Sequence, residues 1–187
     1  MSRTPVREAL FRLDGEGLVF ARGRGVRLRV LAGRELLEVF EARAALEGWA
    51  MGRVADLVGA GEIAPARLAE LDQLADVTNT LTEEGNLTAA TESNRLFHQA
   101  ATRLAENPTV DETLQLWWDQ ITIATREGLD KPKRVRDVDA EHRILLAALR
   151  AGDRAAARGC AEQHALASGD LVQRRLSHPG TASDPGS

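Results

Sequence analysis

The sequence predicts an all-α protein: an antiparallel six-helix bundle, preceded by a short segment with one helix and a β-hairpin. The chain has 187 residues, of which 43% are hydrophobic but only 4% aromatic, with no tyrosine. Its core must therefore be built mainly from Leu, Ala and Val, a composition that favours helices. From residue 34 to residue 176, apolar-periodic stretches alternate with short breaks rich in Gly, Pro or Asn. Such short connections predict helices that fold back on their neighbours.

The first predicted helix begins at Ser2, whose hydroxyl can cap it. Pro5 lies in the first turn, where its missing N–H removes no hydrogen bond. Apolar residues then recur at positions i, i+4 and i+7, which predicts a stripe that must face a partner; they are Val6, Leu10 and Leu13. Two glycines, Gly15 and Gly17, end the helix.

A β-hairpin is predicted for residues 18–30, LVFARGRGVRLRV. Apolar and polar residues alternate there in the manner of strands, and Gly23 and Gly25 surround a turn with arginine at its tip. The bundle follows, with six helices expected over residues 34–58, 64–80, 87–105, 108–127, 135–151 and 153–176. The predicted organisation is a DNA-binding segment at 1–31, a helical domain at 34–176 and a disordered Gly-, Pro- and Ser-rich tail at 177–187.

Charge is distributed unevenly along the chain. Residues 1–34 hold eight arginines and three acidic residues, a net charge of +5, which leaves −9 on the remainder because the total is −4. A basic front on an acidic body indicates that only the front meets a polyanion. The single cysteine, Cys160, excludes an internal disulfide framework, and no stretch is apolar enough to span a membrane. We therefore expect a cytoplasmic protein.

The N-terminal string SRTPVREAL, followed by EGLV, resembles the second half of the winged helix-turn-helix of GntR-family transcriptional regulators. The bundle resembles the FCD ligand-binding domain of the FadR-like branch of that family. The resemblance implies that the helix reads operator DNA in the major groove and that the wing tip approaches the minor groove. Hydroxyls suit phosphates and guanidinium groups suit guanine. The implied DNA-binding residues are Ser2, Arg3, Thr4, Arg7, Gly23 and Arg24.

Members of the family carry further helices and a strand ahead of this point, and those helices cover the apolar stripe of the recognition helix. A short helix without such cover is marginal in water. Either the sequence is truncated or the regulator has lost DNA binding, and we favour truncation.

Three histidines fall in predicted helices, namely His98, His142 and His164. Asn94 and His98 are four residues apart and so share a helix face. Small residues around His98 and His164 predict a lined cavity, and three inward imidazoles with one oxygen ligand suit Zn²⁺ or Ni²⁺. The alternative is that each histidine is an ordinary core residue bonded to a backbone carbonyl.

The resemblance implies a metal site on these residues. Many FCD domains bind a metal through an acid four residues before a histidine, followed by one histidine in each of the last two helices. Asn94, His98, His142 and His164 match that pattern, except that Asn94 stands where Asp is usual. A neutral amide lowers the charge compensation of the site and its expected affinity. The histidines could instead contact a ligand without any metal.

Arg43 is the residue that the resemblance assigns to the effector, because an arginine on the first bundle helix of the family meets the effector's carboxylate. A guanidinium offers two parallel donors for two carboxylate oxygens. The alternative is an ion pair with Glu47, four residues later, and the two roles can coexist. We also expect one of Trp117 and Trp118 to lie in the core.

The function predicted from these observations is a homodimeric, DNA-binding transcriptional regulator that senses a small organic acid through a metal-containing pocket. It is not expected to be an enzyme, because no catalytic motif is found and helical spacing places Glu92 and Glu141 off the ligand face. The alternatives are a metal-dependent enzyme acting on a small carboxylate, a ligand sensor deficient in DNA binding, and a dimerising bundle without a ligand.

Overall fold

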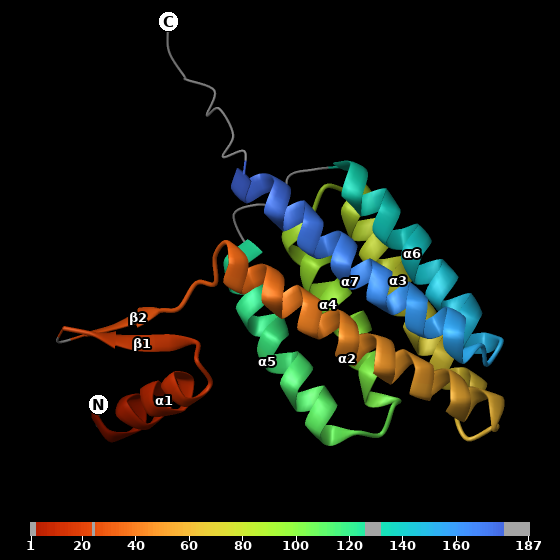
Figure 1. The fold of residues 1–187 in the computed structure, drawn as a ribbon, viewed down its shortest axis with the longest axis horizontal. Helices are drawn as coiled ribbons and strands as arrows, with labels where there is room; N and C mark the ends of the chain where they lie inside the picture. The colour runs from red at the N-terminus through yellow and green to blue at the C-terminus, as the bar shows by residue number, and fades with distance from the viewer. Residues whose placement is uncertain (1–2, 24, 126–131, 178–187) are drawn as a thin grey trace, which may run out of the picture.

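A computed structural model of the chain describes residues 3–23, 25–125 and 132–177 (Figure 1). The described part is mostly helical, with one two-stranded antiparallel sheet, and confirms the predicted fold class. In chain order its elements are α1 (Arg3–Gly15), β1 (Val19–Arg22), β2 (Gly25–Leu28), α2 (Arg34–Gly59), α3 (Pro65–Glu83), α4 (Leu87–Arg103), α5 (Pro108–Thr125), α6 (Pro132–Arg150) and α7 (Arg154–Ser177).

All six predicted bundle helices are present, and their ends differ from the prediction by a few residues. The largest change at a helix start is at α6, which begins at Pro132 rather than at residue 135. The sequence analysis assigns Pro132 to the break between two helices, but the fixed φ of proline suits the first turn of a helix equally well. The predicted tail, residues 177–187, lies almost entirely outside the described residues.

The N-terminal helix and hairpin form a small module that projects to one side of the bundle (Figure 1). In the hairpin, Val19 pairs with Leu28 and Arg22 with Gly25. Gly23 at the turn has φ of 60°, a conformation that favours glycine.

Helix α1 packs mainly against β1 and leaves apolar surface exposed. Val6 of the predicted stripe is 63% exposed, and Phe11 next to the stripe is 64% exposed, whereas Leu10 and Leu13 are partly buried. The predicted capping residue, Ser2, lies outside the described residues. The stripe therefore lacks a full partner among the described elements, as the sequence predicts.

Helices α2 and α7 run antiparallel and make the most extensive contact in the bundle. Glycines allow their backbones to approach closely. A Cβ built on Gly169 would lie 2.9 Å from Cβ of Phe40, and one on Gly48 would lie 2.5 Å from Cγ of Glu162. Since real Cβ atoms do not approach so closely, these glycines set the separation of the two helices.

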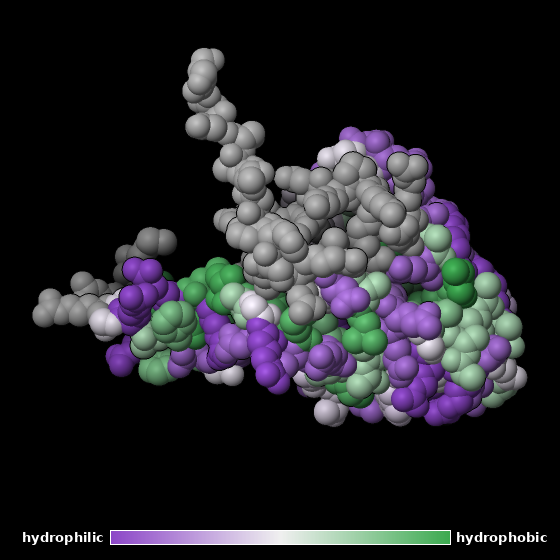
Figure 2. Space-filling model, turned by 45° about the horizontal axis from the view of Figure 1, so that its top comes forward, coloured by the Kyte–Doolittle hydropathy of each residue, from purple (hydrophilic) through white to green (hydrophobic). Residues whose placement is uncertain are grey.

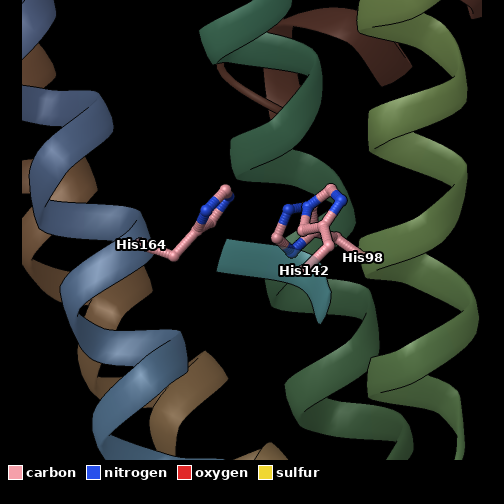
Figure 3. Close-up of side chains that lie close together, drawn as sticks. All are labelled: His98, His142 and His164. Atoms are coloured by element: carbon pink, nitrogen blue, oxygen red, sulfur yellow. The ribbon is translucent and has the colours of Figure 1, made fainter. Parts of the chain in front are cut away.

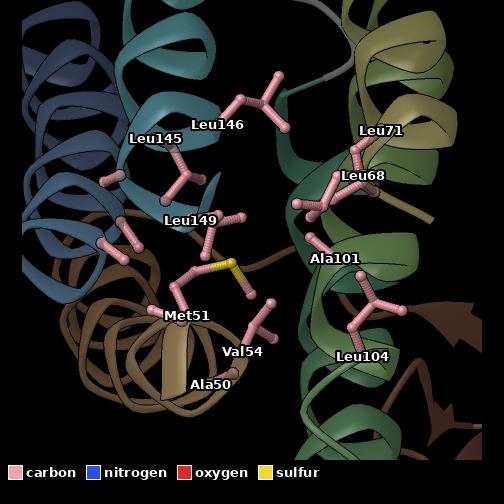
Figure 4. Close-up of a cluster of buried hydrophobic side chains, with 14 of the residues drawn as sticks. Ala50, Met51, Val54, Leu68, Leu71, Ala101, Leu104, Leu145, Leu146 and Leu149 are labelled. Carbon is pink, nitrogen blue, oxygen red and sulfur yellow. The ribbon is translucent and has the colours of Figure 1, made fainter. Parts of the chain in front are cut away.

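The main hydrophobic core lies between α2, α3, α4, α6 and α7 (Figure 4). Its fully buried members include Val54, Leu71, Phe97, Leu146 and Leu149. A smaller cluster of Leu31, Leu36, Phe40 and Ile121 lies where the chain enters the bundle.

Three of the small residues near the histidines belong to the main hydrophobic cluster. Ala101, Ala105 and Ala161 are at most 3% exposed and pack with it. Their small side chains allow neighbouring helices to approach closely, and the cavity expected beside the histidines stays a prediction.

The outer surface mixes hydrophilic and hydrophobic residues on the face shown in Figure 2. Single exposed hydrophobic side chains such as Ile144, 58% exposed, are normal on a protein surface. Of the helices that the structure describes, none is long and apolar enough to cross a membrane.

Candidate functional site

Three histidine rings from three helices meet inside the bundle (Figure 3). His98 comes from α4, His142 from α6 and His164 from α7, and they are 4%, 1% and 5% exposed. Their ring centroids lie 4.8–5.3 Å apart. One ring nitrogen of each lies within 4.8 Å of the corresponding nitrogens of the other two. The structure thus brings together the three histidines that the sequence singled out.

Two carboxylates hold two of these rings from outside the cluster. Glu47 Oε2 lies 3.1 Å from Nδ1 of His98, and Glu141 Oε2 lies 2.6 Å from Nδ1 of His164. An ionised carboxylate only accepts hydrogen bonds, so each Nδ1 carries the proton and donates it. Nε2 of each ring is then the nitrogen available to a ligand.

Burial keeps the imidazoles of His98 and His164 neutral. Desolvation lowers the pKa of His98 to about 4, although the neighbouring Glu47 carboxylate acts in the opposite direction. Desolvation also lowers the pKa of His164, although the hydrogen bond that its Nδ1 donates to Glu141 acts in the opposite direction. Neutral imidazoles present lone pairs, which is the form that binds a metal ion.

On α4, Oδ1 of Asn94 and Nε2 of His98 are buried without a hydrogen-bond partner among the described residues. The two residues lie one helical turn apart. In a tetrahedral Zn²⁺ site, two nitrogens bound at about 2.1 Å lie about 3.4 Å apart. The three ring nitrogens lie within 4.8 Å of one another, so the donor set fits a divalent cation once the rings move together by about 1 Å.

His142 is held by an aromatic neighbour. The Phe97 ring stacks on it with centroids 4.0 Å apart and an interplanar angle of 26°. Phe97 itself is fully buried and immediately precedes His98 on α4. The apolar core therefore fixes the position of one histidine while carboxylates fix the other two.

Arg43 lies in a buried ion pair rather than at an open surface. Its Nε donates to Glu47 Oε1 at 2.6 Å and its Nη2 to Glu47 Oε2 at 3.3 Å, with both side chains at most 2% exposed. The guanidinium carbon lies 3.7 Å from the centroid of the Trp118 ring, a cation–π contact. The ion pair with Glu47, one of the two roles predicted for Arg43, is present in the structure. The other role, contact with the carboxylate of an effector, stays a prediction.

Burial by itself would raise the pKa of Glu47, but the charge of Arg43 and the contact with His98 outweigh it and hold the pKa far below its usual range. Glu47 is thus ionised and shared between a guanidinium and an imidazole. Trp118, 5% exposed, also lies against His98, with ring centroids 5.1 Å apart. It is the tryptophan expected in the core.

The interpretation of Glu141 from sequence is wrong. The sequence predicts that helical spacing places it off the ligand face, yet its carboxylate contacts His164. Glu141 lies four residues before the buried Leu145, and this spacing was the available signal. Glu92, by contrast, faces outward and pairs with Arg95. The contact of Glu47 with His98 was also missed, because it joins two helices.

Of the residues implied in DNA binding, those that the structure describes lie in the projecting module. Thr4 and Arg7 are exposed on α1, and the Arg7 guanidinium lies 5.7 Å from the centroid of the Phe11 ring. Gly23 is at the hairpin turn. Ser2 and Arg24 lie outside the described residues, and of Arg3 only the backbone is described.

Residues 38–167, which contain the histidine cluster and Arg43, match the FCD domain. The chain belongs to the FCD domain family. It is 29% identical over 164 residues to the HTH-type transcriptional regulator McbR of Escherichia coli strain K12, covering 86% of this chain and 72% of McbR. It is 32% identical over 157 residues to a Paenarthrobacter nicotinovorans protein named "Probable D-xylose utilization operon transcriptional repressor", covering 81% of this chain and 65% of that protein.

Solved structures show the same fold. E. coli McbR/YncC superposes with a TM-score of 0.80 at 27% identity over 94% of this chain and 82% of that one. A GntR regulator from Rhodococcus sp. RHA1 superposes with a TM-score of 0.72 at 20% identity, over 92% of this chain and 80% of that one. This FCD protein is a transcriptional regulator of the GntR family and not an enzyme.

Proposed function

We propose that this FCD protein senses a small carboxylate through a divalent metal ion and passes that signal to operator DNA. The observation that carries the proposal is the meeting of three buried histidines from α4, α6 and α7 within 4.8 Å. Buried polar groups normally have partners, and the unpaired Oδ1 of Asn94, on the same helix face as His98, supports a cation site at these imidazole nitrogens.

The metal ligands in this proposal are Nε2 of His98 and His164, one ring nitrogen of His142, and Oδ1 of Asn94. Imidazole ligands suit Zn²⁺ and Ni²⁺. When bound, the ion supplies a positive charge and open coordination positions for an oxygen of the effector. The carboxamide of Asn94 adds no charge, so the affinity for metal is expected to be lower than with Asp at this position.

Arg43 is the proposed second contact of the effector. Its hydrogen bonds to Glu47 use Nε and Nη2, so Nη1 is the nitrogen left to meet a carboxylate oxygen. Trp118 stacks on the guanidinium and limits its movement.

DNA is the proposed partner of the N-terminal module. The relatives McbR and GlaR are named HTH-type regulators, and the basic residues of the module suit phosphates and guanine. The residues are Ser2, Arg3, Thr4, Arg7, Gly23 and Arg24. The protein is proposed to act as a homodimer whose two modules read neighbouring half-sites, with the effector biasing their spacing.

The test measures metal and ligand binding on the purified chain. Elemental analysis of protein prepared without added metal, followed by thermal unfolding with Zn²⁺ or Ni²⁺, is expected to show bound ion or a higher Tm. Dicarboxylates should raise the Tm further in the wild type but not in Arg43→Ala. Arg67→Ala, which breaks only an exposed pair with Glu70, is the control. A protein that contains no metal and whose Tm neither ion changes would refute the metal site.

A further inference from the structure

The two glutamates that contact the histidines have a role beyond the ligand set. We propose that Glu141 and Glu47 are positioning residues that hold His164 and His98 with Nε2 toward the cation and supply negative charge that the ligands themselves lack. The inference rests on the proposed metal site.

Orientation follows from the hydrogen bonds. Glu141 on α6 reaches across to Nδ1 of His164 on α7, and Glu47 on α2 reaches Nδ1 of His98 on α4. Each bond joins two helices, so it fixes both the proton position and the rotation of the ring. A histidine with its Nδ1–H on a carboxylate is also a more basic ligand at Nε2.

The two glutamates also bring negative charge to the proposed site. Three neutral imidazoles and one carboxamide carry no net charge, whereas the ion carries two positive charges. The carboxylates that contact the ligand rings can supply this compensation. Glu47 shares its charge with Arg43, so changing it also disturbs a buried ion pair. Glu141, whose side chain is 30% exposed, allows the cleaner test.

The experiment measures Zn²⁺ affinity at fixed pH by competition with a chromophoric chelator, on the full chain. Glu141→Gln keeps an oxygen that can accept from Nδ1 but removes the charge, and Glu141→Ala removes both. Loss of such outer partners weakens metal binding by about 10- to 100-fold. We expect a loss of about 10-fold for Gln and a larger one for Ala, with a similar Tm of the metal-free proteins. Glu92→Gln removes an equal charge near Asn94 without touching a ring and should bind as the wild type does.

Asn94→Asp separates this role from a merely structural one. A negative charge placed on the ligand itself should tighten Zn²⁺ binding and restore part of the affinity that Glu141→Gln loses, whereas lost packing would not be rescued. Wild-type affinity in both Glu141 variants, or an equal loss in Glu92→Gln, would overturn this inference while leaving the metal site intact. Failure of the wild type itself to bind Zn²⁺ or Ni²⁺ would overturn the metal site and this inference together.

Discussion

Oε2 of Glu47 lies 3.1 Å from Nδ1 of His98, inside the bundle and out of contact with water. The same carboxylate pairs with Arg43, so one buried anion connects the proposed effector contact to a proposed metal ligand. A change at either neighbour alters the electrostatic surroundings of the other. This arrangement offers a physical route by which effector and metal binding influence each other.

Removing the charge of Glu47 should destabilise the protein strongly. Glu47→Gln leaves the buried guanidinium of Arg43 without its counter-charge, and breaking a buried pair in this way costs about 3–5 kcal/mol of unfolding free energy. Urea denaturation with excess chelator measures the loss. Glu38→Gln breaks the exposed pair with Arg34 and should change stability by less than about 1 kcal/mol. Equal stability of the two variants would contradict the buried pair.

Two glycines on α7 should respond oppositely to the same substitution. Gly169→Ala places a Cβ 2.9 Å from Cβ of Phe40, which is attached to the backbone of α2 and cannot swing aside. Such overpacking destabilises by about 1–3 kcal/mol. Gly159→Ala meets nothing within 4 Å among the described atoms and should stabilise by roughly 0.5–1 kcal/mol through its helix propensity. Denaturant unfolding of both variants checks the close approach of α2 and α7; a loss in both would argue against it.

The metal-free protein should lose stability in mild acid. Burial lowers the pKa of His98 from 6.5 to about 4, so the unfolded chain binds the extra proton over that interval. Stability is then present above pH 6.5 and falls as the pH drops toward 4. Glu47, with its lowered pKa, acts in the same direction below pH 4.5.

Between pH 7 and pH 5, His98 alone should lower the free energy of unfolding by about 2 kcal/mol. Urea midpoints in the presence of chelator measure the effect. His98→Gln keeps an N–H for Glu47 but does not titrate, so its midpoints should differ less between the two pH values. If wild-type midpoints are identical at pH 5 and pH 7, the buried neutral imidazole is ruled out.

The main core depends on its fully buried leucines. Leu149→Ala on α6 removes a side chain that is 0% exposed and should cost about 2–5 kcal/mol. Ile144→Ala on the same helix shortens a side chain that is 58% exposed and should change stability by at most about 0.5 kcal/mol. Chemical denaturation of the two variants shows whether α6 turns Leu149 into the core and Ile144 to the surface.

Much of the local structure was predictable because it depends on neighbours a few residues apart. The helix breaks are marked by residues such as Pro108 and Gly152, and the predicted helices correspond to α2 through α7. The shared face of Asn94 and His98 follows from helical periodicity alone. The hairpin of the N-terminal module was also predictable, because apolar and polar residues alternate along its strands and glycines surround its turn.

What the sequence by itself determined is the set of helices and the side chains that turn inward on each of them. Tertiary structure alone decided which inward side chains meet, namely Glu141 with His164, Glu47 with His98, and Trp118 with Arg43. It also decided that alanines near the histidines join the main hydrophobic cluster. Helical periodicity is encoded within three or four residues, whereas contacts between helices depend on how far each helix is rotated and shifted against its neighbour.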